Sequence, residues 1–176
     1  MQGLVLIYEG VEEIEASAVI DILRRAGLGM TVAGTNTIIT GGHGMKVLPD
    51  INIADINADD YDFLVLPGGP GYGNILNSGS VHELIRHFND KEKLIAAICA
   101  APLVLQKSGI LEAKAATAYP GMEKSLKNPK EQNVVIDQNI ITSRGPGTAI
   151  EFSLKIVETL IGKAMSDKLR KDLVYE

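Results

Sequence analysis

The sequence predicts an α/β fold in which a mostly parallel sheet is covered by helices on both faces. Short apolar runs recur along the chain, segments of helical period separate them, and polar or glycine-rich residues follow the runs. Runs that are apolar throughout are typical of parallel strands buried on both faces. Strands that alternate with helices build such a sheet. Since 176 residues suit one core, we expect a single domain over residues 1–176.

Five runs are expected to be strands: GLVLIY at 3–8, GMTVAG at 29–34, DFLVLPGG at 62–69, LIAAIC at 94–99 and NIITSRG at 139–145. Helices are expected at 13–26, 80–90, 101–108 and 147–162. The first helix should pack on the sheet through Ile14, Ala18, Ile22 and Leu23. Two segments depart from the alternation. Residues 36–55 surround a glycine turn, which predicts a hairpin or an excursion from the sheet, and 118–132 should be a loop with at most a short helix.

Composition excludes several classes of protein. The chain is 45% apolar and 22% charged, as expected of a folded domain. A net charge of -5 offers no general attraction for nucleic acid or an anionic membrane, so we expect neither partner. No apolar stretch approaches the ~18 residues that cross a bilayer, and no targeting leader is visible. A single cysteine forms no internal disulfide. Together these features favour the cytoplasm and leave the thiol free for chemistry.

Polar and glycine-rich residues gather at four of the predicted strand ends. In open α/β sheets, ligands bind beyond the carboxyl ends of the strands. The four places are 8–15, 67–74, Cys99 and 143–147. They mark the expected position of the site.

Cys99 stands between a predicted strand and a predicted helix, among small residues. Small neighbours permit the sharp turn that exposes a nucleophile above a sheet, as in the G-x-S-x-G elbow. The N-H groups at a helix start favour thiolate over thiol. The alternative is that Cys99 is a small apolar residue ending a buried strand. The stretch alone leaves both interpretations open.

Two neighbouring segments supply partners for a nucleophile. In PGGPGYGN, the backbone at Gly68 and Gly69 is able to approach a substrate oxygen, with Ala100 N-H as a second donor. The segment lacks the pattern of a phosphate-binding loop. In EGVEEIEAS, Glu12 and Glu13 are ordinary partners of a helix start. Glu15 lies near the packing face, where a buried carboxyl needs a partner such as a thiol.

Histidine is the usual base for a cysteine nucleophile. His82 and His87 lie on a surface-like helix and are expected to be solvated. His43, in TGGHGMK, is expected to border the pocket because glycine turns often lie near strand ends. No histidine follows Cys99, so a Cys-His protease pair is not visible.

The motifs together resemble the ThiJ/PfpI superfamily, on the branch of the parkinsonism-associated protein deglycase and its bacterial relatives. They are EEIEA, VLPGGPG, AAICAAP and TSRGPGTAIEF, in this order along the chain. The resemblance implies a flavodoxin-like three-layer sandwich of the class I glutamine amidotransferase type, and a homodimer. It also implies a reactive Cys99 hydrogen-bonded to a protonated Glu15, with Gly69 and Ala100 as oxyanion donors. The pocket residues it implies are Gly68 and the segment Arg144, Gly145 and Pro146.

The chain departs from the family pattern at two positions. Where human-like members have a histidine before a proline, this chain has Tyr119 before Pro120. A tyrosine donates a hydrogen bond but is a poor base at neutral pH. The residue after Cys99 is Ala100, whereas the protease-like branch has histidine, so peptidase activity is not expected.

The function expected from these residues is cofactor-free, metal-free chemistry on reactive carbonyls. Methylglyoxal or glyoxal would become a hydroxy acid, or adducts on thiols and amines would be removed. Cys99 would attack the aldehyde, Glu15 would move the proton between adjacent carbons, and Tyr119 or His43 would orient the second carbonyl. An alternative is a redox sensor or stress chaperone whose Cys99 oxidises to a sulfinate. A third is a binding protein of this fold without turnover.

Overall fold

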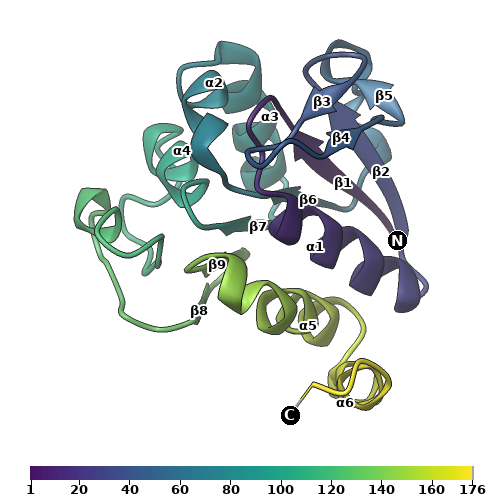
Figure 1. Ribbon diagram of the computed structural model, residues 1–176. Helices are drawn as coiled ribbons and strands as arrows, with labels where there is room; N and C mark the ends of the chain where they lie inside the picture. The colour runs from purple at the N-terminus through teal and green to yellow at the C-terminus, as the bar shows by residue number, and fades with distance from the viewer. Residues whose placement is uncertain (176) are drawn as a thin grey trace.

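The computed structural model describes residues 1–175, and a seven-stranded sheet forms its centre (Figure 1). The strands are β1 (Gln2–Ile7), β2 (Gly29–Gly34), β5 (Ile51–Asn52), β6 (Phe63–Leu66), β7 (Leu94–Ile98), β8 (Val134–Asp137) and β9 (Ile140–Ser143). Their order across the sheet is β5-β2-β1-β6-β7-β9-β8. Every neighbouring pair is parallel except β8 and β9, which are antiparallel. The apolar runs therefore form the parallel centre, as expected.

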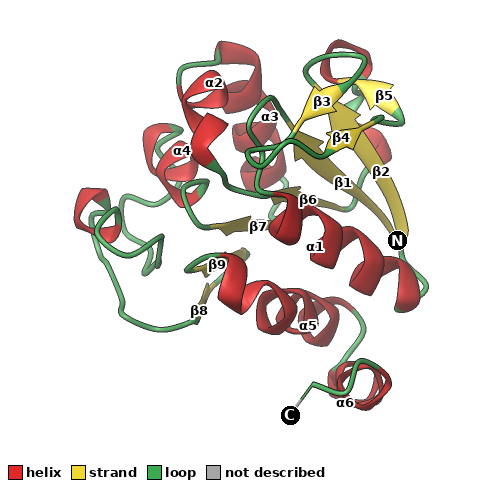
Figure 2. Cartoon of the chain, in the orientation of Figure 1, coloured by secondary structure: helices red, strands yellow, loops and turns green. Residues whose placement is uncertain are grey.

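Six α-helices within residues 1–175 cover the two faces of this sheet (Figure 2). They are α1 (Glu13–Arg25), α2 (Gly73–Leu76), α3 (Gly79–Asp90), α4 (Pro102–Lys107), α5 (Ala149–Leu160) and α6 (Lys163–Asp172). Helices α1 and α5 pack together on one face, with α6 against α5, while α2, α3 and α4 cover the other. This arrangement confirms the predicted flavodoxin-like α/β fold. No helix in residues 1–175 has the length and apolarity needed to cross a membrane.

The two segments that depart from the alternation differ in structure. Strands β3 (Ile39–Thr40) and β4 (Lys46–Val47) form an antiparallel hairpin apart from the main sheet, which confirms the expected hairpin. The same segment ends in β5, which joins the edge of the main sheet beside β2. Within 118–132 there is a single 3-10 turn at Glu123–Ser125 and an isolated β-bridge from Pro129 to Ala116. This agrees with the expected loop.

The packing face of α1 differs from the prediction at its start. Ile14 is 57% exposed, whereas Glu15, Val19 and Ile22 are buried. A helix turns about 100° per residue, so Glu15 and Val19 share the inner side while Ile14 faces outward; Ala18 is half-buried and packs against the core, as expected. Assigning Ile14 to the core was therefore wrong. The same rotation buries the Glu15 carboxyl against the sheet.

The loop after β1 and the loop after β6 are bound to each other by their backbones. Glu12 N-H donates to Gly68 O at 2.9 Å, and Gly71 N-H donates to Gly10 O at 2.9 Å. A Cβ on Gly69 would lie 2.4 Å from Gly10 O and from Glu12 N, and Gly69 has a φ of 119°. Only glycine permits this approach and this conformation. The two loops thus form one rigid wall at the carboxyl edge of the sheet.

Candidate active site

Cys99 lies at a sharp turn between β7 and α4. Its φ of 65° falls in the left-handed region, which is unfavourable for a residue with a Cβ. Cys99 N-H donates to Ser143 O at 2.9 Å, and Tyr119 N-H donates to Cys99 O at 2.8 Å, so both neighbouring segments hold the turn. A Cβ on Gly68 would lie 2.6 Å from the Cβ of Cys99. The elbow expected from the small neighbours is therefore present.

The Glu15 carboxyl is fully buried beside the thiol. Its Oε2 accepts the Gly68 N-H at 2.7 Å, while Oε1 has no partner of full hydrogen-bond geometry within the part of the chain described. Burial raises the pKa of Glu15 to about 7, although the Gly68 N-H and the Cys99 thiol act to lower it. From the sequence, two opposing effects on the charge of Glu15 were expected: the helix start favours the carboxylate, and burial favours the protonated acid. In the structure burial prevails.

The Cys99 thiol is not pre-ionised. Burial, followed by the charge of Glu15, raises the pKa of Cys99 to about 12. The N-H groups of Gly69 and Ala100 donate toward the sulfur and lower this pKa, but they do not offset the burial. The N-H groups at the elbow thus favour the thiolate, as expected, but burial outweighs them. Cys99 and Glu15 act as a coupled pair that loses one proton near pH 7 and keeps a second one well above it.

Tyr8 supports this pair and was not predicted as a site residue. Its ring is fully buried, and its hydroxyl donates to Pro67 O at 2.9 Å. Burial and the charges of Glu15 and Cys99 raise the Tyr8 pKa well above its ordinary value, so the phenol stays a donor. The bond fixes the end of β6 just before Gly68. A tyrosine closing a buried apolar run was the available signal in the sequence.

A cavity of about 420 Å³ opens over the elbow, within the range of small-molecule sites. Six predicted or candidate residues line it: Gly69, Cys99, Ala100, His43, Tyr119 and Pro146. Four others were not predicted as pocket residues: Glu12, Pro70, Tyr72 and Met122. Arg144 and Gly145 line an adjoining cavity of about 320 Å³ instead, together with Tyr119 and Pro146. Gly68 lies against the Cβ of Cys99, behind the cavity lining.

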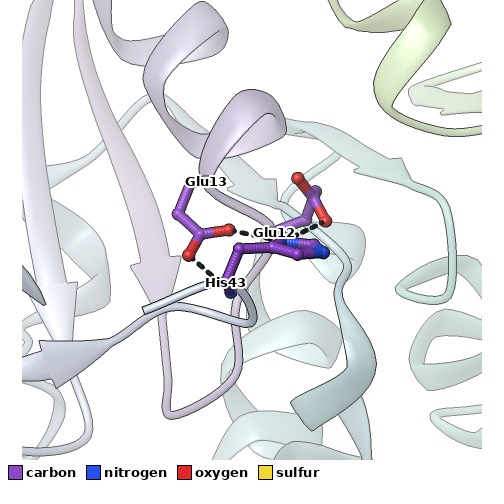
Figure 3. A group of neighbouring side chains, drawn as sticks. All are labelled: Glu12, Glu13 and His43. Atoms are coloured by element: carbon purple, nitrogen blue, oxygen red, sulfur yellow. Dashed lines mark hydrogen bonds and ion pairs between the residues drawn. The ribbon is translucent and has the colours of Figure 1, made fainter. Parts of the chain in front are cut away.

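His43 enters the cavity from the turn between β3 and β4, beside the start of α1 (Figure 3). Its Nδ1 lies 3.0 Å from Glu13 Oε2 and 3.5 Å from Glu12 Oε2. Its backbone N-H donates to Glu13 Oε1 at 2.7 Å, and that of Met45 does so at 3.3 Å. Glu13 thus ties the hairpin to α1, a role beyond the expected partnership with the helix start.

The pKa values of this cluster diverge. Partial burial acts to raise the pKa of Glu13, but hydrogen bonds from its own backbone, from His43 and from Met45 lower it to about 2. The hydrogen bond to Glu13 and the charges of both glutamates raise the pKa of His43. One ligand atom from each of these three side chains lies within 4.8 Å of the others, the only such metal-type grouping in residues 1–175. Hydrogen bonds inside the chain already occupy the Glu13 carboxylate and His43 Nδ1.

The other two histidines lie outside the cavity. His82 is not solvated as expected, because its Nδ1 lies 2.7 Å from Ser108 Oγ and its Nε2 lies 3.0 Å from Leu76 O. These bonds join α3 to its neighbours. His87 Nε2 pairs with Asp59 Oδ1 at 3.0 Å near the surface. Neither histidine is placed to act on Cys99.

Known proteins resemble the chain over almost its whole length. The profile of the DJ-1/PfpI family matches residues 1–159. Protein dj-1beta of Drosophila melanogaster is 44% identical over 183 residues, covering 98% of this chain and 96% of that protein. The glutathione-independent glyoxalase DJR-1.2 of Caenorhabditis elegans is 37% identical, covering 94% and 91%. The structure of Toxoplasma gondii DJ-1, oxidized, superposes with a TM-score of 0.95 at 37% identity, covering 99% and 98%.

Proposed function

The chain belongs to the DJ-1/PfpI family, and from that premise we propose that it is a cofactor-free enzyme acting on reactive carbonyls. It converts methylglyoxal or glyoxal to a hydroxy acid, or removes their adducts from thiols and amines. One observation carries the proposal: Cys99 stands at the elbow beside the buried Glu15 carboxyl and lines a cavity. The name of the C. elegans relative, a glyoxalase that needs no glutathione, supports the same chemistry.

The reaction begins with one proton on the Cys99 and Glu15 pair, the state reached above pH about 7. Cys99 sulfur bonds to the aldehyde carbon while its proton passes to Glu15. The carbonyl electrons move to the aldehyde oxygen, which takes the proton from Glu15 and leaves a hemithioacetal. Each step follows the logic of an activated nucleophile with an adjacent base.

The hydrogen on the former aldehyde carbon then moves to the neighbouring carbon by proton transfers. The Glu15 carboxylate removes the proton from the former aldehyde carbon and returns it to the neighbouring carbon, while the hydroxyl proton moves between the two oxygens. The product is a thioester of the hydroxy acid. Water hydrolyses this thioester, which releases lactate from methylglyoxal and restores the thiol. The N-H groups of Gly69 and Ala100, which point at the sulfur, donate to the oxyanion beside it.

The test is methylglyoxal consumption and lactate formation by the purified protein. Cys99→Ser and Glu15→Ala should each abolish turnover, and Glu83→Gln, an exposed change on α3, should leave it intact. Full turnover in Glu15→Ala would refute the proton-shuttle role. No turnover in the wild type would refute the enzyme.

A second candidate function is redox sensing or a linked chaperone role through oxidation of Cys99 to a sulfinate. The N-H groups of Gly69 and Ala100 and the Glu15 carboxyl surround the sulfur, and such donors stabilise sulfinate oxygens. The T. gondii relative was solved in an oxidized form. Mass spectrometry after mild peroxide tests the idea. A Cys99 that gains no two-oxygen adduct while methionines oxidise would count against it.

We further propose that the chain forms a homodimer and works in the cytoplasm. Exposed apolar side chains gather where the β3–β4 hairpin meets α1, among them Ile14, Met45 and Leu48. Such a patch is typical of an interface. A monomer in sedimentation at micromolar concentration would refute the dimer. The single reduced thiol suits a reducing compartment, and fractionation of cells expressing the protein tests that location.

A further inference from the structure

The cavity over Cys99 contains an imidazole that the proposed reaction has not yet used. His43 comes from the β3–β4 turn, and its side chain is 72% exposed at the cavity border. Glu12 and Glu13 enter from the start of α1, with side chains only 9% and 11% exposed. A largely exposed histidine is thus attached to two buried carboxylates (Figure 3).

These contacts determine which nitrogen is available. Both carboxylates approach Nδ1, at 3.0 Å and 3.5 Å, so Nδ1 carries a proton and donates it. Nε2 has no hydrogen-bond partner among the residues the structure describes. A carboxylate that holds one ring nitrogen leaves the other to exchange protons with a substrate, which is the arrangement of a catalytic histidine.

Tyr119 is the other polar side chain suggested for the second carbonyl. It is 46% exposed, and its ring lies against Gly145, where an added Cβ would be 3.2 Å from Tyr119 Cδ2. A phenol gives up its proton only near pH 10. The imidazole changes its charge near neutral pH, and carboxylates hold it in place. His43 is therefore the better acid–base group.

We propose that His43 is a catalytic acid–base residue of the carbonyl reaction, held in position by Glu13 and Glu12. This inference rests on the proposed function. As Glu15 removes the carbon-bound proton, Nε2-H of the imidazolium gives its proton to the second carbonyl oxygen, and an enediol forms. When the thioester forms, Nε2 takes the hydroxyl proton from the first oxygen. This regenerates the imidazolium, so His43 ends the cycle with the same number of protons as it began.

The charges around the ring suit this role. The titratable groups that face His43 are Glu13, the first residue of α1, and Glu12, which caps that helix. Glu13 stays ionised because its pKa lies near 2, and together the two carboxylates raise the pKa of His43. The proton donor is thereby kept charged further toward neutral pH.

Kinetics of His43→Asn test the inference. We expect kcat for methylglyoxal to fall by about 100-fold, the usual contribution of a general acid–base group, with KM changed less than kcat. The loss in free energy of unfolding should stay below about 1 kcal/mol, the usual contribution of an exposed ion pair such as that with Glu13. His87→Asn is the matched control, since it removes a histidine paired with a carboxylate outside the cavity, and it should keep full activity. Tyr119→Phe separates the two candidates. A kcat within twofold of wild type in His43→Asn, or the larger loss in Tyr119→Phe, would overturn the assignment.

A second readout does not depend on turnover. Alkylation of Cys99 by anionic iodoacetate and by neutral iodoacetamide gives a ratio of rates that reports charge near the sulfur. Loss of one positive charge from the cavity border should lower this ratio at pH 6 in His43→Asn, by at most the roughly fivefold effect of a charge at contact distance in water. A merely structural role would leave the ratio unchanged, and that result would also overturn the inference.

The two proposals fail differently. A wild type that forms no lactate would remove the proposed function and the catalytic role of His43 with it. An active wild type with a fully active His43→Asn would remove only the role of His43.

Discussion

Replacing Glu15 by glutamine should stabilise the protein at alkaline pH while abolishing its activity. The carboxyl is fully buried, and its pKa is about 7 instead of the ordinary 4.5. The folded state therefore binds this proton more tightly than the unfolded state does. Stability from the protonated acid is complete below pH 4.5 and is lost as pH rises through 7.

The magnitude follows from the shift. A displacement of about 2.5 pKa units at about 1.36 kcal/mol each amounts to about 3 kcal/mol. Glutamine has the same shape, its side-chain oxygen still accepts the Gly68 N-H, and it never ionises. We therefore expect Glu15→Gln to exceed the wild type by about 3 kcal/mol in free energy of unfolding at pH 8, relative to the difference between them at pH 4.

Urea unfolding at both pH values, at one protein concentration, measures this difference. Glu83→Gln, which replaces an exposed glutamate on α3, is the control, and its difference in stability from the wild type should be the same at pH 4 and pH 8. If the gap between Glu15→Gln and wild type is the same at pH 4 and pH 8, within about 0.5 kcal/mol, then Glu15 is not the buried acid described above.

Three further predictions concern the surroundings of the elbow. Gly68→Ala places a methyl group 2.6 Å from the Cβ of Cys99, so we expect a loss of about 1–3 kcal/mol in urea unfolding together with lower turnover; wild-type stability would contradict the close approach. Tyr8→Phe removes the buried bond to Pro67 O and should cost about 1–2 kcal/mol, measured by the same unfolding; no loss would mean that Pro67 O finds another donor. Glu13→Gln should destabilise the protein at pH 7, because folding lowers the pKa of Glu13 to about 2 and so contributes stability above pH 4.5 that is lost as pH falls toward 2. A Glu13→Gln deficit that persists at pH 2 would argue against this charge.

The sheet and its main helices were predictable because their apolar patterns are continuous. Strands β5 and β8 were missed for the opposite reason: β5 has two residues, and β8 has only one buried position. Helix α6 was missed because it is mostly polar and buries only Ser166 and Leu169. Short or mostly exposed elements are fixed by tertiary contacts, which leave little trace in local sequence.

The site was predictable where backbone geometry demands particular residues. Small residues around Cys99 and paired glycines after β6 indicate that these two segments approach closely, and the structure shows this close approach. Proton affinities were not predictable in this way. The pKa of Cys99 depends on burial and on Glu15, and the cluster at His43 joins segments about thirty residues apart. These contributions to proton affinity arise only once the chain has folded and brought the groups together.

The wall formed by the two interlocked loops bears on how new substrates can be acquired. Gly10, Gly69 and Gly71 meet backbone to backbone, and an added Cβ at any of them would lie within 2.8 Å of main-chain atoms. None of these three glycines can therefore be replaced without displacing the backbone of the wall. The cavity is also lined by Tyr119 and Met122, which lie on a long loop. Substitutions there reshape the chamber without moving Cys99 or Glu15, so that loop is the place where selection or a designed library can alter specificity while the reactive centre stays constant.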